Sequence, residues 1–379
     1  ALFLLKGMGA LIGTVWESIL RYAVISVASV ALGYVGYLFY TLSAQPLRDD
    51  FPYKTIDIDH PLFIANDLSG YENRPDITFD KISKGIVQGQ PVIVRTPIRH
   101  DADGGRVPVM GDTGSTAAKS VVAVGGSQTW GQGVAAEQTF PTVFASLLGL
   151  PVRNYGVSGS GGASSYFLLK QKLAKTSPKY VLYGFWEDHL NRNLRYCANN
   201  NFPVCAPLAY VSGTRDSEFK LNPAENAQAL LEDFQALVRD MQQPPTIFGL
   251  ANEVYWAHRR LMRQLDMAMN PLAYDSASVP HKIDAARFVL ASISALAHEA
   301  GAQLIVLYIP LYFSDTIHSA DPALIKTAEE HDFLFVDMAE VLRDMRANSI
   351  PFSIKGDGHL TVEAHMAIAR RLRARIAEN

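Results

Sequence analysis

From Ser120 onward, short runs of consecutive apolar residues alternate with longer stretches in which apolar residues recur at helical spacing. The apolar runs are Val121–Val124, Tyr180–Phe185, Leu304–Ile309 and Leu334–Val336. The stretch Val152–Tyr155, which includes two polar residues, is expected to form a further strand. The helical patterns lie near residues 137–149, 161–175, 280–300, 321–331 and 339–347. Short apolar runs without polar alternation are typical of strands buried on both faces, as parallel strands are. The alternation predicts an α/β fold with a doubly wound, flavodoxin-like parallel sheet of about five strands and flanking helices.

The first of these strands ends in a glycine-rich turn. Gly125-Gly126-Ser127 follows the apolar run, and Gly131 and Gly133 come shortly after. Glycines permit backbone dihedrals that other residues avoid, and they let a substrate approach closely. In open α/β sheets ligands bind at the carboxyl ends of the strands, where a strand-to-helix turn can display a nucleophile. Ser127 is therefore a candidate nucleophile, although an isolated Gly-Gly-Ser also fits a simple polar turn.

A serine nucleophile requires a base, and the chain offers one near its C-terminus. Asp357-Gly358-His359 precedes a helix-patterned tail over residues 362–377. Asp and His two residues apart on one loop can place the imidazole to accept the serine proton, while the carboxylate fixes the orientation and tautomer of the ring. We therefore expect Ser127, His359 and Asp357 to act as nucleophile, base and orienting acid.

These segments resemble the sequence blocks of the SGNH/GDSL hydrolase superfamily. Ser127 stands in the first block and Asp357 with His359 in the last, and the stretch Asn154-Tyr155-Gly156-Val157-Ser158-Gly159 is similar to the family's Asn-x-Gly-x-x-Gly turn. The resemblance covers roughly residues 119–190 and 280–379. It implies ester chemistry through an acyl-serine, with the backbone N–H groups of Ser127 and Gly159 as oxyanion donors. We expect no cofactor and no metal.

Two blocks depart from the family pattern. The usual Gly-Asp-Ser reads Gly-Gly-Ser here, which removes an acid that the triad does not need. Many members carry Gly-x-Asn-Asp, whose Asn donates to the oxyanion, whereas this chain has Glu187 where a donor is expected, in the stretch Gly184-Phe185-Trp186-Glu187-Asp188-His189. An ionised carboxylate cannot donate, and the loss of one such donor typically costs about 100-fold to 1,000-fold in rate.

Several polar residues near these blocks are candidates for binding substrate or supporting the triad. They are Asn154, Glu187, Asp188 and His189. The side chains of His189, Asn191 and Asn193 are the candidates to replace the missing donor.

Residues 1–45 differ in character from the rest of the chain. The segment 22–44 is apolar and holds no charged residue, and at ~1.5 Å per residue it is long enough to cross the ~30 Å core of a bilayer. We predict one transmembrane helix; a cleaved signal peptide is the alternative. Residues 1–20 are expected to lie at the membrane interface or to pack on another membrane protein. Lys6 and Arg21 precede the span, which places the body outside the cytoplasm, at a bacterial inner membrane.

The two cysteines support this location. Cys197 and Cys205 lie eight positions apart in a polar loop, which is not a metal-ligand spacing. We predict a local disulfide, and such bridges persist in oxidising compartments such as the periplasm or the cell exterior. Two free thiols in a reducing compartment are the alternative.

The remaining sequence divides into two parts. Residues 46–118 hold alternating segments broken by Pro, Gly and Asp, which predict a small β-rich appendage. Within it, Gly70-Tyr71-Glu72-Asn73-Arg74-Pro75 is similar to the lead-in of some membrane-anchored bacterial SGNH proteins. Residues 119–379 are expected to form the α/β domain, with a helical insertion at about 190–279 that could act as a lid or a substrate platform.

Together these features predict an extracytoplasmic, membrane-anchored serine esterase or O-acyltransferase. The resemblance extends to polysaccharide O-acetylation proteins of the alginate acetyltransferase type, which implies acetyl esters of a glycan as substrate. With a net charge of −3, nothing in the chain indicates a nucleic-acid partner. The alternative is a non-catalytic subunit that keeps the fold and joins a larger membrane assembly; Glu187 favours it, and the intact Ser, Asp and His set opposes it.

Overall fold

In the computed structural model the described residues are 54–56, 62–87, 90–109, 119–198, 206–214, 217–242, 278–312, 316–354 and 358–378. All of them belong to one compact unit, formed by Pro52–Gln243 and Arg260–Asn379. The predicted membrane segment 22–44 and residues 243–277 of the predicted helical insertion lie outside the described residues. Among the helices that the structure describes, none is both long enough and apolar enough to cross a bilayer.

A five-stranded parallel sheet forms the centre of the described fold and confirms the predicted fold class. Its strands are β6 (Val121–Gly125), β7 (Val152–Asn154), β8 (Tyr180–Trp186), β13 (Gln303–Ile309) and β14 (Leu334–Asp337). They lie in the order β14, β13, β8, β6, β7. Counted along the chain within this sheet, the order is the 2-1-3-4-5 arrangement of flavodoxin-like folds.

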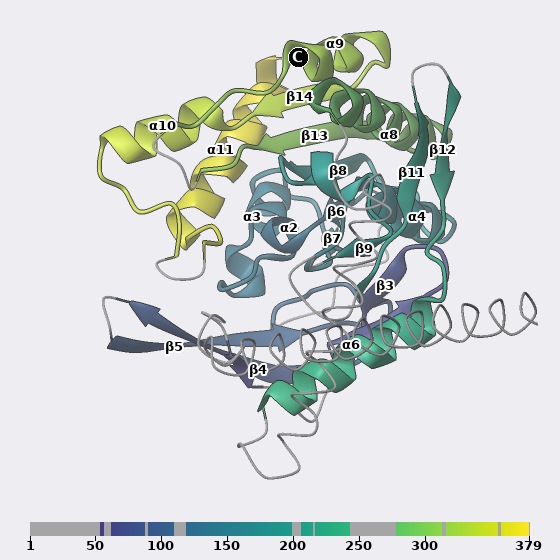
Figure 1. The fold of residues 1–379 in the computed structure, drawn as a ribbon. Helices are drawn as coiled ribbons and strands as arrows, with labels where there is room; N and C mark the ends of the chain where they lie inside the picture. The colour runs from purple at the N-terminus through teal and green to yellow at the C-terminus, as the bar shows by residue number, and fades with distance from the viewer. Residues whose placement is uncertain are drawn as a thin grey trace, which may run out of the picture. The chain divides into compact units, whose positions relative to one another are not determined.

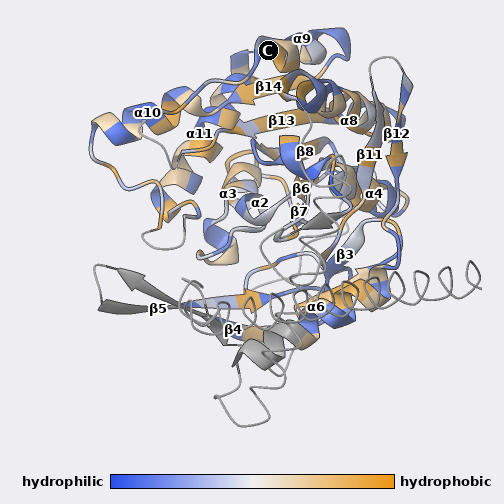
Figure 2. Ribbon diagram, in the orientation of Figure 1, coloured by the Kyte–Doolittle hydropathy of each residue, from blue (hydrophilic) through white to orange (hydrophobic). Residues whose placement is uncertain are grey.

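Helices cover both faces of this sheet (Figure 1). Val122 and Val124 of β6 pack in one buried cluster with α4, α8 and α9, whereas Val121 and Ala123 pack in a second cluster with α3, α10 and α11. These helices are α3 (Phe140–Leu147), α4 (Gly162–Leu173), α8 (Val279–Glu299), α9 (Pro322–Glu330), α10 (Ala339–Ala347) and α11 (Val362–Glu378). Successive side chains of a strand point to opposite faces, so only a strand that is apolar throughout fills both clusters. Figure 2 shows this in the hydrophobic colouring of β13 and β14.

The helices change face where the connections between strands change direction. β7 lies on one side of β6, and β8, β13 and β14 follow on the other side. Parallel crossovers are almost always right-handed, so a reversal of direction moves the connecting helix to the opposite face. Accordingly α3, between β6 and β7, packs on one face, and α4 and α9 pack on the other. The reversal falls between β6 and β8, and such sheets bind ligands at this point.

Short antiparallel strands accompany the central sheet. In the β-rich segment, β1 (Lys54–Ile56), β4 (Thr78–Val87) and β5 (Gln90–Arg99) form one sheet, and β2 (Phe63–Asn66) pairs with β3 (Gly70–Asn73). The predicted helical insertion contains α6 (Ala227–Gln242), a short pair β9 (Cys197–Ala198) and β10 (Ala206–Pro207), and a hairpin of β11 (Tyr210–Thr214) and β12 (Ser217–Asn222). The hairpin was not predicted, because most of its side chains are exposed or half-buried and give little apolar periodicity.

Arg106, which follows β5, joins the β-rich segment to the loop after the glycine-rich turn. Its guanidinium donates to the carbonyl oxygens of Trp130 (2.7 Å), Gly131 and Val134, and it lies 4.5 Å from the centre of the Trp130 ring. The residue is 1% exposed, and burial lowers the pKa of Arg106 to about 9, so the group remains protonated at neutral pH. The backbone N–H of Arg106 also donates to the carbonyl of Asn154 (2.8 Å).

Replacing Arg106 is therefore expected to destabilise the protein. Arg106→Met keeps a long side chain but removes the donor of three buried carbonyl groups, so we expect the free energy of unfolding to fall by about 3 kcal/mol. Arg106→Lys keeps the charge but lacks the planar guanidinium, so we expect its free energy of unfolding to lie between those of the wild type and Arg106→Met. Urea denaturation measures all three proteins. A Met variant within about 0.5 kcal/mol of wild type, the range typical of surface changes, would contradict this account.

Candidate active site

The glycine-rich turn sits at the carboxyl end of β6. The strand ends at Gly125, and the short helix α2 (Ser127–Trp130) begins two residues later. Gly125 has a φ of 147°, and a Cβ there would lie 2.3 Å from the Thr129 hydroxyl oxygen. A Cβ on Gly184 of the neighbouring strand β8 would lie 2.0 Å from the same oxygen. Only glycine fits at either position, because α2 packs directly against the ends of both strands.

The structure brings Ser127 and His359 together. Ser127 Oγ lies 2.8 Å from His359 Nε2, a hydrogen-bond distance, although the two residues are 232 positions apart in the chain. Ser127 is 4% exposed, and His359 is half-buried. Two of the three predicted triad members are thus in contact. The third, Asp357, lies outside the described residues.

Two side chains hold the backbone on both sides of the predicted base. Gln128 Oε1 accepts the N–H of Leu360 (3.1 Å), and Gln128 Nε2 donates to the Tyr312 hydroxyl (2.8 Å). That hydroxyl in turn donates to the carbonyl of Gly358 (2.7 Å). Because Gln128 directly follows Ser127, the same turn of helix carries the nucleophile and fixes the loop of the base. Neither side chain was among the predicted site residues, although the place of Gln128 beside the nucleophile is a signal that could have indicated it.

The predicted second block forms the loop after β7. Asn154 Nδ2 donates to the carbonyl of Thr129 (2.8 Å), and Asn154 Oδ1 accepts the N–H of Gly156 (3.0 Å). A Cβ on Gly156 would lie 2.4 Å from the backbone nitrogen of Trp130. The loop backbone therefore lies against α2, and Asn154 supports this contact between the first and second blocks.

Two backbone donors remain unused at this junction. The N–H of Val157 and the hydroxyl of Ser160 both donate to the carbonyl of Gly125 (2.9 and 3.0 Å), so the second-block loop is bonded to the end of β6. Within the part of the chain that the structure describes, neither the N–H of Ser127 nor that of Gly159 has a hydrogen-bond partner. Donors of this kind, held in place before a ligand arrives, are what an oxyanion hole requires.

The carboxylates of the third block bond to other groups of the protein. Glu187 Oε2 accepts the N–H of Leu311 (2.7 Å), so the carboxylate found in place of a donor ties the end of β8 to the segment after β13. Asp188 pairs with Arg192 (2.6 Å), whose guanidinium also donates to the carbonyl of Ser160 (3.1 Å). Both predicted residues thus support the backbone around the site.

His189 lies behind the nucleophile turn. It is 0% exposed, its Nδ1 is 2.8 Å from the Tyr183 hydroxyl, and a Cβ on Gly126 would lie 3.0 Å from its Nε2. Burial holds the pKa of His189 well below its usual value, so the ring is neutral. Of the other two candidate donors, Asn191 donates its amide N–H to Asp188 (3.1 Å), and Asn193 is buried.

Trp186, the last residue of β8, is a donor that the sequence analysis missed. The register of the sheet pairs Gly125, the last residue of β6, with Gly184, so β8 extends two residues further than β6 at this edge of the sheet. The indole packs in the cluster that includes α11, the helix after His359. Among the described residues its buried Nε1 has no hydrogen-bond partner. Because an indole N–H can only donate, β8 ends with an unpaired donor even though no Asn follows it.

The sequence also predicts that the protein binds no metal and that its two cysteines form a disulfide. In the described ranges, no three His, Cys, Asp or Glu side chains gather where they could hold a metal ion. Cys205 lies outside the described residues, so its disulfide with Cys197 stays a prediction.

Comparison with known proteins gives low similarity. No protein-family profile and no curated protein sequence matches the chain. Similar solved structures include a protein assigned to the SGNH hydrolases from Slackia heliotrinireducens (14% identity, TM-score 0.36, 69% of this chain and 100% of that one). A catalytic variant of the acetylxylan esterase Axe2 from Geobacillus stearothermophilus gives 15% identity and a TM-score of 0.36 over 68% of this chain and 94% of that one. LAE5, an α/β hydrolase from the metagenome of Lake Arreo, has 14% identity and a TM-score of 0.39 over 69% of this chain and 96% of that one. Similarity this low carries no functional assignment, which depends on the site itself.

Two further histidines are buried in the neutral form near the site. His100 Nε2 accepts the indole N–H of Trp130 (3.2 Å) and its Nδ1 lies 3.0 Å from the carbonyl of Arg74. Burial lowers the pKa of His100 to about 4. His365 Nδ1 accepts the N–H of Phe140 (3.1 Å), and burial lowers the pKa of His365 to about 3.

Acidification is therefore expected to destabilise the protein. The stability that depends on neutral His100 and His365 is complete above the unfolded pKa of about 6.5 and is lost as the pH falls through their folded values of about 4 and about 3. We expect the free energy of unfolding at about pH 5 to be roughly 1 to 2 kcal/mol lower per histidine than at about pH 7.5. Urea denaturation at both pH values measures this difference.

His365→Asn is the matched control. Its amide oxygen can replace Nδ1 as the acceptor for Phe140, but the group does not titrate. We expect the difference between the two pH values to shrink by the contribution of one histidine. A variant with the full wild-type pH dependence would show that His365 is not one of the groups responsible.

Proposed function

We propose that the chain is a serine enzyme that acts on carboxylic esters, as an esterase or as an O-acyltransferase. The observation that carries this proposal is the 2.8 Å contact between Ser127 Oγ and His359 Nε2, at the carboxyl end of a strand in a parallel sheet. A hydroxyl in contact with an imidazole is the arrangement that activates serine for attack. The unpaired N–H groups of Ser127 and Gly159 support the proposal, since acyl transfer develops negative charge on the carbonyl oxygen.

The proposed reaction has two steps that share one intermediate. Ser127 Oγ attacks the carbonyl carbon while its proton passes to His359 Nε2, and the carbonyl oxygen becomes an oxyanion held by the two N–H groups. Collapse of this adduct breaks the ester bond, and the departing alkoxide takes the proton from His359. Water or an acceptor hydroxyl then attacks the acyl-serine, with His359 again accepting and returning a proton. Asp357 is the proposed partner that orients the ring through Nδ1.

The substrate and the setting follow from the sequence resemblance and are part of the proposal. We infer an acetyl ester of a glycan as substrate, with water or a sugar hydroxyl resolving the acyl-enzyme. The segment 22–44 would anchor the chain in the inner membrane of a bacterium, with the body in the periplasm and residues 1–20 available to other membrane proteins.

A fluorophosphonate probe tests the central claim. Because this probe reacts with activated serines, we expect it to label the wild-type protein at one site and to leave Ser127→Ala unlabelled. Ser165→Ala is the matched control, since Ser165 is also buried but its hydroxyl donates to the carbonyl of Gly161 (2.8 Å), the residue before α4. Wild-type protein that stays unlabelled while folded would instead support the non-catalytic subunit.

The proposed compartment has its own test. Titration of thiols in denatured, unreduced protein is expected to find none, because Cys197 and Cys205 are proposed to form a disulfide. Reduction before the titration should reveal both. Two free thiols in protein purified from the native host would place the body in a reducing compartment instead.

A further inference from the structure

Strand β3 of the β-rich segment contacts the loop that carries Gly159. Tyr71 and Asn73 are two positions apart on β3, so their side chains leave the strand on the same face. The Tyr71 hydroxyl donates to the carbonyl of Ser158 (2.8 Å), and Asn73 Nδ2 donates to the carbonyl of Gly156 (2.9 Å). Both residues are buried, at 4% and 2% exposure.

The bond from Tyr71 fixes the direction of the Gly159 N–H. The carbonyl of Ser158 and the N–H of Gly159 belong to one peptide unit, and no peptide bond in the described residues is cis. In a trans peptide the C=O and N–H vectors point in opposite directions. Since the carbonyl faces the Tyr71 hydroxyl, the N–H must face away from it. A hydroxyl bonded to the carbonyl also polarises the peptide and makes its N–H a stronger donor.

Only glycine fits at position 159 while this bond is made, and its φ of 86° is also one that favours glycine. A Cβ at this position would lie 2.4 Å from the Tyr71 hydroxyl oxygen. The loop is held from its other side as well, because the N–H of Val157 and the hydroxyl of Ser160 both donate to the carbonyl of Gly125. The peptide unit of Gly159 is thus fixed between β3 and the end of β6.

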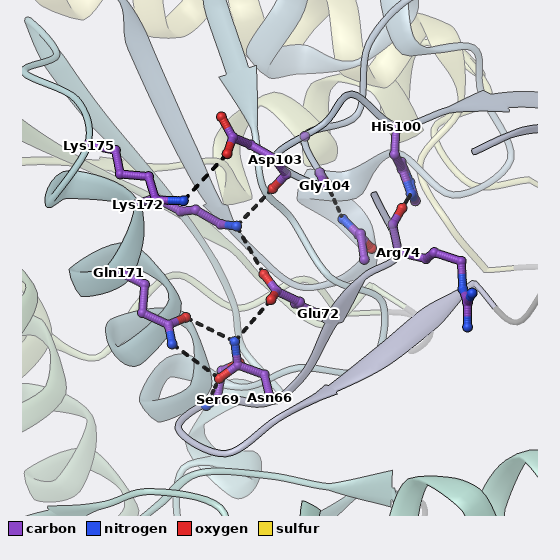
Figure 3. Close-up of polar contacts among 12 residues, drawn as sticks. Asn66, Ser69, Glu72, Arg74, His100, Asp103, Gly104, Gln171, Lys172 and Lys175 are labelled. Atoms are coloured by element: carbon purple, nitrogen blue, oxygen red, sulfur yellow. Dashed lines mark hydrogen bonds and ion pairs between the residues drawn. The ribbon is translucent and has the colours of Figure 1, made fainter. Parts of the chain in front are cut away.

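β3 is itself anchored on helix α4 (Figure 3). Glu72, which leaves the strand on the opposite face from Tyr71, pairs with Lys172 (3.0 Å), and Lys172 also donates to the carbonyl of Asp103 (2.8 Å). Asn66, before the turn into β3, donates to Gln171 of the same helix (2.9 Å). Burial raises the pKa of Tyr71 far above its usual value, so the hydroxyl keeps its proton and acts as a donor.

We propose that Tyr71 is a positioning residue that orients the Ser158–Gly159 peptide so that the Gly159 N–H serves the oxyanion, with Asn73 holding the start of the same loop. This inference rests on the proposed function. It gives the β-rich segment a role in the reaction, through a side chain that need not touch substrate.

The test compares kinetic constants for the hydrolysis of p-nitrophenyl acetate. Tyr71→Phe keeps the ring, which packs 5.0 Å from Phe63, and removes only the hydroxyl. We expect kcat to fall about 10-fold with KM changed less than about 2-fold, since the loss of a whole oxyanion donor costs 100-fold or more and this change only loosens one. Binding of phenylboronic acid, which forms a tetrahedral adduct with an active serine, should weaken by a similar factor.

Rescue separates orientation from packing. p-Aminophenylalanine at position 71 supplies an N–H donor in place of the hydroxyl and should restore most of kcat. Tyr210→Phe is the matched control, because the Tyr210 hydroxyl contacts Glu225 (3.3 Å) at the surface, and it should behave as wild type. If Tyr71→Phe fails to fold, the p-aminophenylalanine variant still tests the proposal. If that variant folds and its kcat is nevertheless reduced 10-fold, the proposal is overturned.

Other outcomes are also decisive. Unchanged kcat and boronate binding in folded Tyr71→Phe, or an increase in KM alone, would overturn the positioning role while leaving the proposed function intact. Wild-type protein that neither turns over the ester nor reacts with the fluorophosphonate probe would overturn the proposed function, and this inference with it.

Discussion

The packing of helix α2 against the carboxyl ends of β6 and β8 is the constraint on which the site depends. All four residues of α2 are buried, and the Thr129 hydroxyl occupies the space that side chains at Gly125 and Gly184 would need. Two glycines on neighbouring strands therefore determine how closely the helix approaches the sheet. This gives Ser127 a fixed position at the point where the connections reverse direction, before any other part of the site is considered.

The loops of the base and of Gly159 are attached to this helix and to the strand before it. Gln128 holds the segment after His359, and Asn154 bonds to the carbonyl of Thr129. Each attachment joins a side chain to a backbone group, which defines where a loop lies more closely than apolar packing does. Loops anchored in this way can hold reacting groups in place before substrate arrives.

The β-rich segment packs on the same elements from outside the sheet. Trp130, at the end of α2, has the cations of Lys81 and Arg106 within 5.1 and 4.5 Å of its ring, and its indole N–H donates to His100. Cation–π contacts of this kind are stronger when they are desolvated. The segment before the central sheet thus stabilises the helix that carries the nucleophile, which agrees with its place in the same compact unit.

The sequence predicted the central sheet well and the supports of the site poorly. Strands such as β6 are apolar on both faces, so a continuous apolar run in the sequence indicates them. The glycines before Ser127 indicate the turn that ends β6. By contrast, the bonds made by Gln128, Tyr71 and Arg106 join a polar side chain to a distant backbone carbonyl, and such pairs have no periodicity or fixed spacing. Glu187 was judged by the residue type expected there, whereas its structural role depends on the N–H of Leu311, more than a hundred residues away.

The distance along the chain between Ser127 and His359 has a consequence for biosynthesis. The two residues are separated by 232 positions, and four of the five strands of the central sheet and most of the helices are made between them. A ribosome must therefore translate almost the whole chain before the hydroxyl meets its imidazole, and slow, non-local pairing delays that meeting further. A nascent or C-terminally truncated chain that lacks His359 therefore carries the serine without its base.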